Sequence, residues 1–309
     1  MKRIVIGANA HAELSAALTA ARPDIEFRGN RYAEITAEDL AWGEGYLGFR
    51  RPPTPSMGNI RWVHCTGAGV DSWLYPEELP RDILLTRSSE SFGPRIAEWA
   101  LTRALAFTQQ VISLNDAQRA RQWAPRDTAL LSGTRVLVVG TGDIGTQVAR
   151  LFGALGCDVT GVSRTASGDP QVFAKRAPVS ALAGLVSDAQ VIVITVPLTN
   201  ETRGLFSREL LAQCRGVTLL NAGRGAVVEE SALPDALENG WLRGAALDVF
   251  EVEPLPDTSP LWSHPRVMIS PHISGLTTTQ GAVDGFLECL GAVERGEVPR
   301  WLVDRARGY

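Results

Sequence analysis

Three polar side chains in the second half of the sequence have the types needed to reduce a carbonyl group. An imidazolium can donate a proton to a ketone oxygen that becomes negative as a hydride arrives, and a neighbouring carboxylate favours the protonated imidazole. A guanidinium can bind the carboxylate of a 2-keto acid and polarise its ketone. The three residues are Arg224 in Asn221–Gly225, Glu253 in Leu247–Pro254 and His272 in Ser270–Gly275. We expect all three to be catalytic, with Arg224 and His272 also binding the substrate.

Taken singly, each of these residues has an ordinary structural interpretation. An arginine or a glutamate in a loop is usually solvated, and a histidine beside Pro271 is more often structural. The interpretation changes because the three segments end successive predicted strands. Ligands of open α/β sheets bind at the carboxyl ends of strands, so the combination favours one catalytic site.

A glycine-rich loop in the same half, Gly140-Thr141-Gly142-Asp143-Ile144-Gly145, matches the pattern G-x-G-x-x-G. The pattern alone is weak, but here it follows an apolar run and precedes a helix-like stretch, which is the context of a dinucleotide site. The first glycine permits a tight turn, the second lets a pyrophosphate approach, and the third allows helix and strand to pack closely. Amide groups and the helix dipole would then bind the anion.

The choice of cofactor is expected about 20 residues beyond that loop, where NAD-selective sites place an acid against the ribose 2′-hydroxyl. This sequence has Gly161-Val162-Ser163-Arg164-Thr165 there, without an acid. Arg164 can pair with a 2′-phosphate, and Ser163 and Thr165 can donate hydrogen bonds to it. NADP(H) is therefore favoured, while NAD(H) with a solvated Arg164 stays open.

From Gly133 onward, apolar runs alternate with helix-like stretches. Apolar strands alternating with helices indicate a parallel sheet that is covered on both faces. The expected strands are Val136–Val139, Val159–Val162, Val191–Val196, Thr218–Leu220, Ala245–Val249 and Val267–Ile269, with a helix at Thr146–Leu155. We expect residues 93–278 to form a dinucleotide-binding domain.

The first 90 residues indicate a second α/β domain. Its expected strands are Ile4–Ile6, Gly45–Phe49, Trp62–Cys65 and Leu84–Thr86, with a helix at Ala12–Ala21. Residues 95–121 contain strong helix formers without Gly or Pro, which predicts one long helix between the domains. The tail from Thr279 to Tyr309 is too short to fold alone and is expected to pack onto the first part, giving a substrate domain of residues 1–92 and 279–309. The expected fold class is α/β, with two Rossmann-like, doubly wound parallel-sheet domains, of which the substrate domain is smaller and discontinuous.

Composition excludes several classes of protein. The 309 residues carry a formal net charge of −4 and are 45% hydrophobic, as is usual for globular chains. Mild acidity gives no basic surface for nucleic acid, and no apolar run approaches the roughly 20 residues of a membrane span. No cysteine lies in a C-x-x-C pair, so neither a metal site nor a redox dithiol is indicated. Four scattered thiols, at Cys65, Cys157, Cys214 and Cys289, suit a reducing cytoplasm.

The three catalytic segments also carry a family resemblance. Asn-Ala-Gly-Arg-Gly, Leu-Asp-Val-Phe-x-x-Glu-Pro and Pro-His-Ile-Ser-Gly resemble the signatures of the D-isomer-specific 2-hydroxyacid dehydrogenases. The order Arg, Glu, His matches that family's catalytic set. The resemblance implies a split substrate domain around an inserted nucleotide domain, in agreement with the division above, and it suggests a homodimer built on the nucleotide domain, through the long helix and Trp123.

Further site residues are implied by this resemblance. Thr66–Asp71 resembles the family's substrate loop, in which the amides of Ala68 and Gly69 would bind the substrate carboxylate. Asp248 matches a residue that contacts the nicotinamide carboxamide, although a loop cap is the alternative. The expected cofactor contacts are Gly140, Gly142, Asp143, Ile144, Gly145, Ser163, Arg164, Thr165, Val196, Pro197, Ala222, Asp248 and Gly275.

Within the family, the segments Val303–Tyr309, Ser163–Thr165 and Ser259–Val267 resemble the NADPH-dependent glyoxylate/hydroxypyruvate reductases of the bacterial A type. Trp73 departs from that group, which usually has a smaller aliphatic residue at this position. If Trp73 lines the pocket, it alters the side chain that the substrate can carry. A place in the hydrophobic core is the more frequent role of such a residue.

Two other functions stay open at this level. One is reduction of a larger 2-keto acid, such as pyruvate, phenylpyruvate or a branched acid, because pocket shape gives only modest discrimination per methylene. The other is a non-catalytic protein that senses NAD(P)H, since a fold alone does not fix function. Turnover of a 2-keto acid with NADPH would distinguish the enzyme from the sensor.

Overall fold

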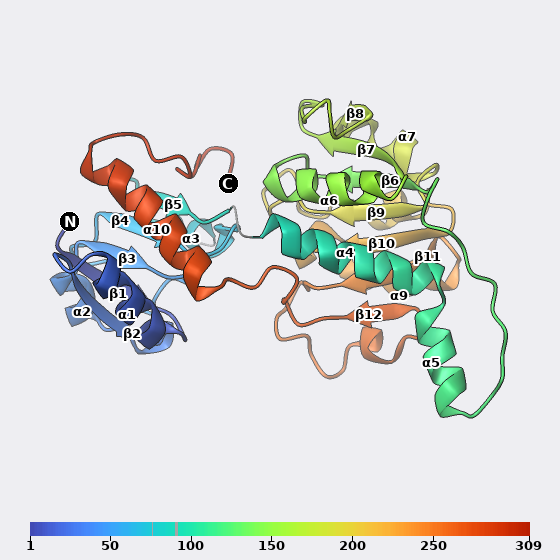
Figure 1. Ribbon diagram of the computed structural model, residues 1–309, viewed down its shortest axis with the longest axis horizontal. Coiled ribbons are helices and arrows are strands. Elements are labelled where there is room, and N and C mark those ends of the chain that lie inside the picture. The colour runs from blue at the N-terminus through green and yellow to red at the C-terminus, as the bar shows by residue number, and fades with distance from the viewer. Residues whose placement is uncertain (76, 90–91) are drawn as a thin grey trace. The chain divides into compact units, whose positions relative to one another are not determined.

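The computed structural model describes residues 1–75, 77–89 and 92–309. The chain forms two compact units, each with its own parallel sheet (Figure 1). Unit 1 consists of Met1–Phe92 and Thr277–Tyr309, and unit 2 consists of Gly93–Leu276, which ends two residues before the expected boundary at 278. The predicted fold class, α/β with two parallel sheets, is confirmed.

Unit 1 is built on a five-stranded parallel sheet in the order β2-β1-β3-β4-β5. Because side chains alternate between the faces of a strand, Ile4 and Trp62 pack with α1 and α10 on one face, whereas Val5 and Val63 pack into a separate cluster on the other. The C-terminal helix α10 thus completes the core of unit 1 (Figure 1). Its elements are β1 (Arg3–Gly7), α1 (His11–Ala21), β2 (Glu26–Asn30), a 3-10 turn at Tyr32–Glu34, α2 (Ala37–Trp42), β3 (Gly45–Leu47), β4 (Trp62–Cys65), α3 (Asp71–Leu74), β5 (Leu84–Arg87) and α10 (Thr279–Glu294).

Unit 2 is built on a seven-stranded sheet in the order β12-β11-β10-β9-β6-β7-β8, and each pairing is parallel. Helices α4 and α6 lie side by side on one face of it (Figure 1). Its strands are β6 (Arg135–Val139), β7 (Asp158–Ser163), β8 (Lys175–Pro178), β9 (Val191–Ile194), β10 (Val217–Asn221), β11 (Leu242–Leu247) and β12 (Val267–Ile269). Its helices are α4 (Gly93–Thr108), α5 (Val111–Arg119), α6 (Asp143–Ala154), α7 (Leu182–Val186), α8 (Arg208–Leu211) and α9 (Leu233–Glu238), with 3-10 turns at Val179–Ala181, Gly225–Val227, Glu230–Ala232 and Pro260–Ser263.

The single long helix expected over residues 95–121 is wrong. The helix ends at Thr108 and a second one begins at Val111. Gln110 between them adopts the left-handed conformation, with φ 55°. A residue in that region ends the first helix as a C-terminal cap commonly does, and glutamine gives no sequence signal for it.

An extended arm, residues 122–130, follows α5 and leads back to β6 without regular structure (Figure 1). Two hydrogen bonds tie its far end to α4 and the residue after it: the Ala129 amide donates to the Thr108 carbonyl at 2.9 Å, and Gln109 Nε2 donates to the Ala129 carbonyl at 2.8 Å. Trp123 is 97% exposed and Leu130 82%. No helix of the described residues is both long and apolar enough to cross a membrane.

Candidate active site

The predicted catalytic and cofactor residues of unit 2 follow the carboxyl ends of its strands. Because all of its strands are parallel, these ends lie along one edge of the sheet. After β6 the chain adds β7 and β8 on one side of that strand, and it then adds β9 to β12 on the other side, so the strand order reverses between β6 and β9. This switch point is where open α/β sheets bind nucleotides.

The three glycines of the loop between β6 and α6 have three different geometric roles. Gly140 has φ 111°, a left-handed conformation that favours glycine. A Cβ on Gly145 would clash with the Gly140 carbonyl, so this position needs glycine for close packing. A Cβ on Gly142 would meet no described atom within 4 Å, so this position leaves the loop open on one side. Together they form a loop that a pyrophosphate can approach, at the amino end of α6.

The segment after β7 is held against the glycine loop. Thr141 Oγ1 donates to the Ser167 carbonyl at 2.7 Å, and the Ser163 hydroxyl donates to the same carbonyl at 3.1 Å. Arg176 Nη1 donates to the Gly168 carbonyl at 3.0 Å. The side chains of Arg164 and Thr165 are exposed on this fixed turn, which presents a guanidinium at the end of the second strand.

The loop that carries Arg224 is shaped by its neighbours. Asn221 is buried, and its side chain accepts from the Gly223 amide and donates to the Arg224 carbonyl, both at 3.1 Å. A Cβ on Gly223 would lie 2.7 Å from the Val196 carbonyl, and one on Gly225 would clash with the Phe250 backbone. The two glycines that flank Arg224 therefore let its loop pack tightly between the segments that follow β9 and β11.

The loop that carries His272 is held by a buried carboxylate. Asp248 Oδ1 accepts from the Ser270 hydroxyl at 2.5 Å and from the Ile273 amide at 3.0 Å, and Oδ2 accepts from the Ser274 amide at 2.8 Å. Trp99 Nε1 of α4 donates to the Ser270 hydroxyl at 2.9 Å. The His272 amide donates to the Asp248 carbonyl at 2.8 Å, and His272 itself has φ 55°. These bonds fix the direction of the imidazole.

Glu253 and His272 form a hydrogen-bonded pair. Glu253 Oε2 lies 2.7 Å from His272 Nδ1, and Oε1 accepts from the Phe250 amide at 3.1 Å. Burial raises the pKa of Glu253, but the hydrogen bond and charge of His272, the Phe250 amide and the charge of Arg224 outweigh it, and the pKa lies below its ordinary value. The structure thus brings together the carboxylate, the imidazole and the field of the guanidinium, with Glu253 ionised at neutral pH.

This arrangement suits proton donation to a substrate oxygen. Since Nδ1 bonds Glu253, the ring nitrogen left to face a substrate is Nε2. The carboxylate stabilises the positive charge of a protonated ring, and a nearby arginine offers donors for an anionic ligand. Asn221, Ser270 and Trp99 position this site, and their roles were not predicted from the sequence. Among the described residues, no cluster of three or more His, Cys, Asp or Glu is placed to hold a metal.

The segment predicted to bind a substrate carboxylate, Thr66–Gly69, belongs to unit 1 and follows β4. Its carbonyls point at other groups of the unit: Thr277 Oγ1 donates to the Thr66 carbonyl at 3.1 Å and Arg87 Nη1 to the Ala68 carbonyl at 3.0 Å. Within the described part of the chain, the amides of Ala68 and Gly69 have no acceptor. The loop therefore presents N–H groups that an anion can bind.

Trp73 lies in the core of unit 1. Its side chain is fully buried, meets the Tyr46 ring edge-on at 5.5 Å between centroids, and donates from Nε1 to the Phe49 carbonyl at 3.0 Å. Of the two roles considered for Trp73, the structure favours the core aromatic.

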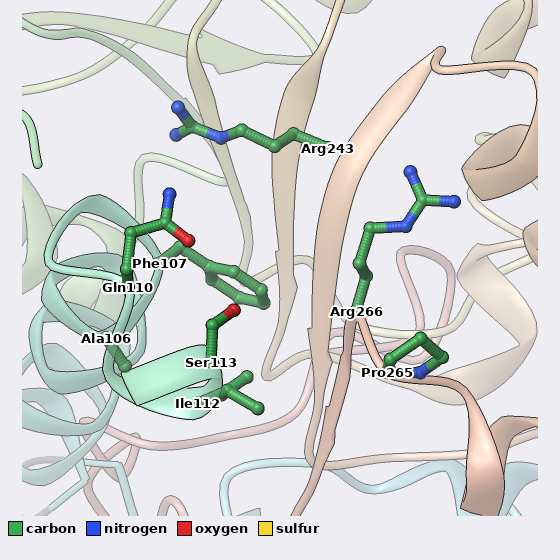
Figure 2. Close-up of a pocket in the computed structure, with 8 residues that line it drawn as sticks. All are labelled: Ala106, Phe107, Gln110, Ile112, Ser113, Arg243, Pro265 and Arg266. Atoms are coloured by element: carbon green, nitrogen blue, oxygen red, sulfur yellow. The ribbon is translucent and has the colours of Figure 1, made fainter. Parts of the chain in front are cut away.

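One cavity of unit 2, of about 190 Å³, lies away from these residues (Figure 2). It opens near the amino ends of β11 and β12, the edge of the sheet opposite the candidate site. Both of its arginines are already engaged: Arg243 donates to Thr218 Oγ1 at 3.1 Å, and Arg266 lies 3.6 Å from Glu238. Its lining consists of Ala106, Phe107, Gln110, Ile112, Ser113, Arg243, Pro265 and Arg266.

Comparison with known proteins gives a consistent result. Residues 101–274 match the family model described as D-isomer specific 2-hydroxyacid dehydrogenase, NAD binding domain. The chain is 34% identical over 291 residues to a glyoxylate/hydroxypyruvate reductase A of Serratia proteamaculans, an alignment that covers 88% of this chain and 92% of the relative.

Solved structures agree in fold over the whole chain. A D-isomer specific 2-hydroxyacid dehydrogenase of Xanthobacter autotrophicus, in complex with NADPH and MES, is 32% identical with a TM-score of 0.90, covering 100% of this chain and 99% of its own. An NADPH-dependent glyoxylate/hydroxypyruvate reductase of Sinorhizobium meliloti, in complex with NADP and sulfate, has a TM-score of 0.88 at 24% identity and covers 100% of both chains. At that identity the second likeness concerns the fold alone.

Proposed function

The chain belongs to the D-isomer specific 2-hydroxyacid dehydrogenase family, and from that premise we propose that it reduces a small 2-keto acid of the glyoxylate or hydroxypyruvate type to the D-2-hydroxy acid with NADPH. The observation that carries the proposal is the 2.7 Å pair of His272 and Glu253 in the field of Arg224. Relatives named glyoxylate/hydroxypyruvate reductase A support the substrate class.

In the proposed reaction, each catalytic side chain has one role. Arg224 binds the substrate carboxylate and polarises the ketone. A bound NADPH would supply the hydride to the carbonyl carbon. As negative charge grows on the carbonyl oxygen, His272 gives it the proton from Nε2, and Glu253 stabilises the imidazolium before that transfer. Ala68 and Gly69 would hold the carboxylate with their amides.

The cofactor is proposed to lie along the carboxyl edge of unit 2. Gly140, Gly142, Asp143, Ile144 and Gly145 would hold the pyrophosphate, and Arg164 with Ser163 and Thr165 would hold the 2′-phosphate. Val196, Pro197, Ala222 and Gly275 would lie beside the ring system. Asp248 already accepts three hydrogen bonds. These bonds are the loop-cap role considered for Asp248, whose side chain is fully buried, and a contact with the nicotinamide carboxamide is proposed from the family resemblance.

A substrate panel tests the proposal. Oxidation of NADPH and of NADH, followed by absorbance, is measured with glyoxylate, hydroxypyruvate, pyruvate and phenylpyruvate. We expect the highest kcat/KM with NADPH and one of the first two acids. A preference for phenylpyruvate would assign a larger substrate, and NADPH binding without turnover of any acid would favour a nucleotide sensor.

The role of His272 has its own test. His272→Gln removes the proton donor, so kcat should fall by about 10² to 10⁴ while the Kd for NADPH, measured by fluorescence titration, stays unchanged. His264→Gln is a matched control, because His264 pairs with Glu238 at 3.3 Å elsewhere in unit 2. Equal activity of the two variants would refute the role of His272.

We also propose a homodimer in the cytoplasm. The four cysteines are thiols outside any disulfide, and three of them are buried, as suits a reducing compartment. The exposed Trp123 and Leu130 of the arm support association of two copies.

A further inference from the structure

Arg87 connects the last strand of the unit 1 sheet to the loop proposed to bind the substrate carboxylate. It is half-buried at the end of β5, and its amide donates to the Trp301 carbonyl at 3.1 Å. Its Nη1 donates to the Ala68 carbonyl at 3.0 Å, and its guanidinium carbon lies 6.0 Å from the centre of the Trp301 ring. The backbone and the side chain are thus both anchored, with the positive charge directed at the loop.

The carbonyl that Arg87 binds belongs to the same peptide group as the Gly69 amide. Hydrogen bonds polarise one another along a chain, so a donor at the carbonyl oxygen strengthens the N–H group of that peptide. A charged donor does so more than a neutral one, because charge-assisted bonds are the stronger class. The Gly69 amide therefore becomes a better donor to an anion than an ordinary loop amide.

The rest of the loop is held in a similar way but by neutral groups. The Thr277 hydroxyl donates to the Thr66 carbonyl, which shares its peptide with the Gly67 amide. The Cys65 thiol donates to the Gly69 carbonyl at 3.5 Å. Of these three carbonyls, the Ala68 carbonyl is the one bound by a charged group, the guanidinium of Arg87.

We propose that Arg87 is a positioning residue for the substrate, which orients and polarises the Gly69 amide and adds positive potential where the substrate carboxylate binds. The proposal rests on the proposed function, because it concerns the same anion. It assigns Arg87 no contact with the substrate and no part in proton transfer. Its effect is therefore expected in binding of the carboxylate and not in the chemical step.

Three substitutions separate the charge from the hydrogen bond. Arg87→Met removes both, Arg87→Gln keeps a neutral donor, and Arg87→Lys keeps the charge. We expect the KM for glyoxylate to rise about tenfold in Arg87→Met and less in the other two, with kcat changed by less than about threefold. The Ki of oxalate, a dicarboxylate probe, should rise by a similar factor, while the Kd for NADPH stays constant.

Arg300→Met provides the matched control. The Arg300 guanidinium stacks on the same Trp301 ring at 4.6 Å, and it lies 3.9 Å from Glu288. This variant removes one positive charge from unit 1 without touching the Ala68 carbonyl. A KM for glyoxylate that rises equally in both variants would attribute the effect to net charge and overturn the proposal.

Two further results decide the matter. A folded Arg87→Met enzyme with wild-type KM and wild-type Ki for oxalate would overturn it; if that variant does not fold, the Gln and Lys variants are judged by the same measurements.

If the wild-type protein turns over no 2-keto acid, the proposed function fails separately. Calorimetric titration of oxalate into the NADPH-bound protein then still tests Arg87, and equal affinity in wild type and variants refutes its role.

Discussion

At the scale of single residues, His64 is a buried histidine whose hydrogen bonds are all to neutral groups. It is fully buried in β4, with Nδ1 2.9 Å from the Thr86 hydroxyl and Nε2 3.0 Å from the Ser88 hydroxyl. Burial lowers its pKa from 6.5 to about 3. The ring is therefore neutral in the folded protein at every pH at which the protein would be assayed.

The buried neutral ring predicts a pH dependence of stability. Below pH 6.5 the unfolded chain binds a proton at His64 that the folded chain does not bind until about pH 3, so the free energy of unfolding decreases as the pH falls through this window. By linkage the loss is about 2 kcal/mol at about pH 5. Urea unfolding between pH 5 and pH 7 measures it. His64→Gln keeps a neutral hydrogen-bonding side chain and should flatten the dependence; an equal slope in both proteins would contradict the pKa.

Single residues also mark the limit of what the sequence predicts about the site. Arg224, Glu253 and His272 could be predicted as catalytic residues because each lies in a short sequence motif at the end of a predicted strand. Asn221 and Trp99 could not, because their roles come from contacts: the first clamps the Arg224 loop, and the second reaches from α4 to Ser270. Such positioning residues become identifiable only when distant segments are placed side by side.

At the scale of elements, the tight packing of two loops sets the geometry of the site. A Cβ on Gly225 would clash with the Phe250 backbone, so Gly225→Ala must push apart the loops that carry Arg224 and Glu253. We expect kcat/KM to fall by about a hundredfold, because small misplacements of catalytic groups cost that much, with the Kd for NADPH retained. Gly153→Ala in α6 is the control, since a Cβ there meets no described atom within 4 Å. Full activity of Gly225→Ala would show that this packing does not position the catalytic groups.

The elements that the sequence predicted well are those whose burial is uniform. β9 and β10 are buried along their whole length, β9 as an apolar run and β10 with two leucines at its centre, and both were expected. β2 (Glu26–Asn30) and β8 (Lys175–Pro178) were not, because both lie at sheet edges, are partly or fully exposed and carry charged residues, with a proline ending β8. Edge strands carry such residues to avoid pairing with other chains, and this removes the apolar pattern by which a strand is recognised.

At the scale of the whole molecule, the arm of unit 2 is the feature least explained by a single chain. Trp123 and Leu130 are 97% and 82% exposed, and large exposed apolar surface often marks a site of association with another chain. Apart from Ala124, which is partly buried, the residues of the arm are exposed, and the arm is hydrogen-bonded only near its ends: among the described residues, the Gln122 amide donates to the Ala117 carbonyl of α5, and Ala129 bonds Thr108 of α4 and Gln109. A second copy is the occupant that the family resemblance suggests.

Light scattering on the intact protein tests this prediction. The chain has a mass of 33.3 kDa, and we expect the particle to have twice that mass. Replacing Trp123 and Leu130 together by Ser removes apolar area without adding charge, so it should shift the population towards monomer as the protein is diluted. Trp262→Ser is the matched control: Trp262 is 52% exposed in the same unit but donates from Nε1 to the Pro256 carbonyl at 3.0 Å, and it lies outside the arm. A monomeric wild-type protein would contradict the predicted dimer. A double variant that stays dimeric at every dilution would show that the arm is not part of the interface, because an interface built on these two side chains would be weakened by their loss.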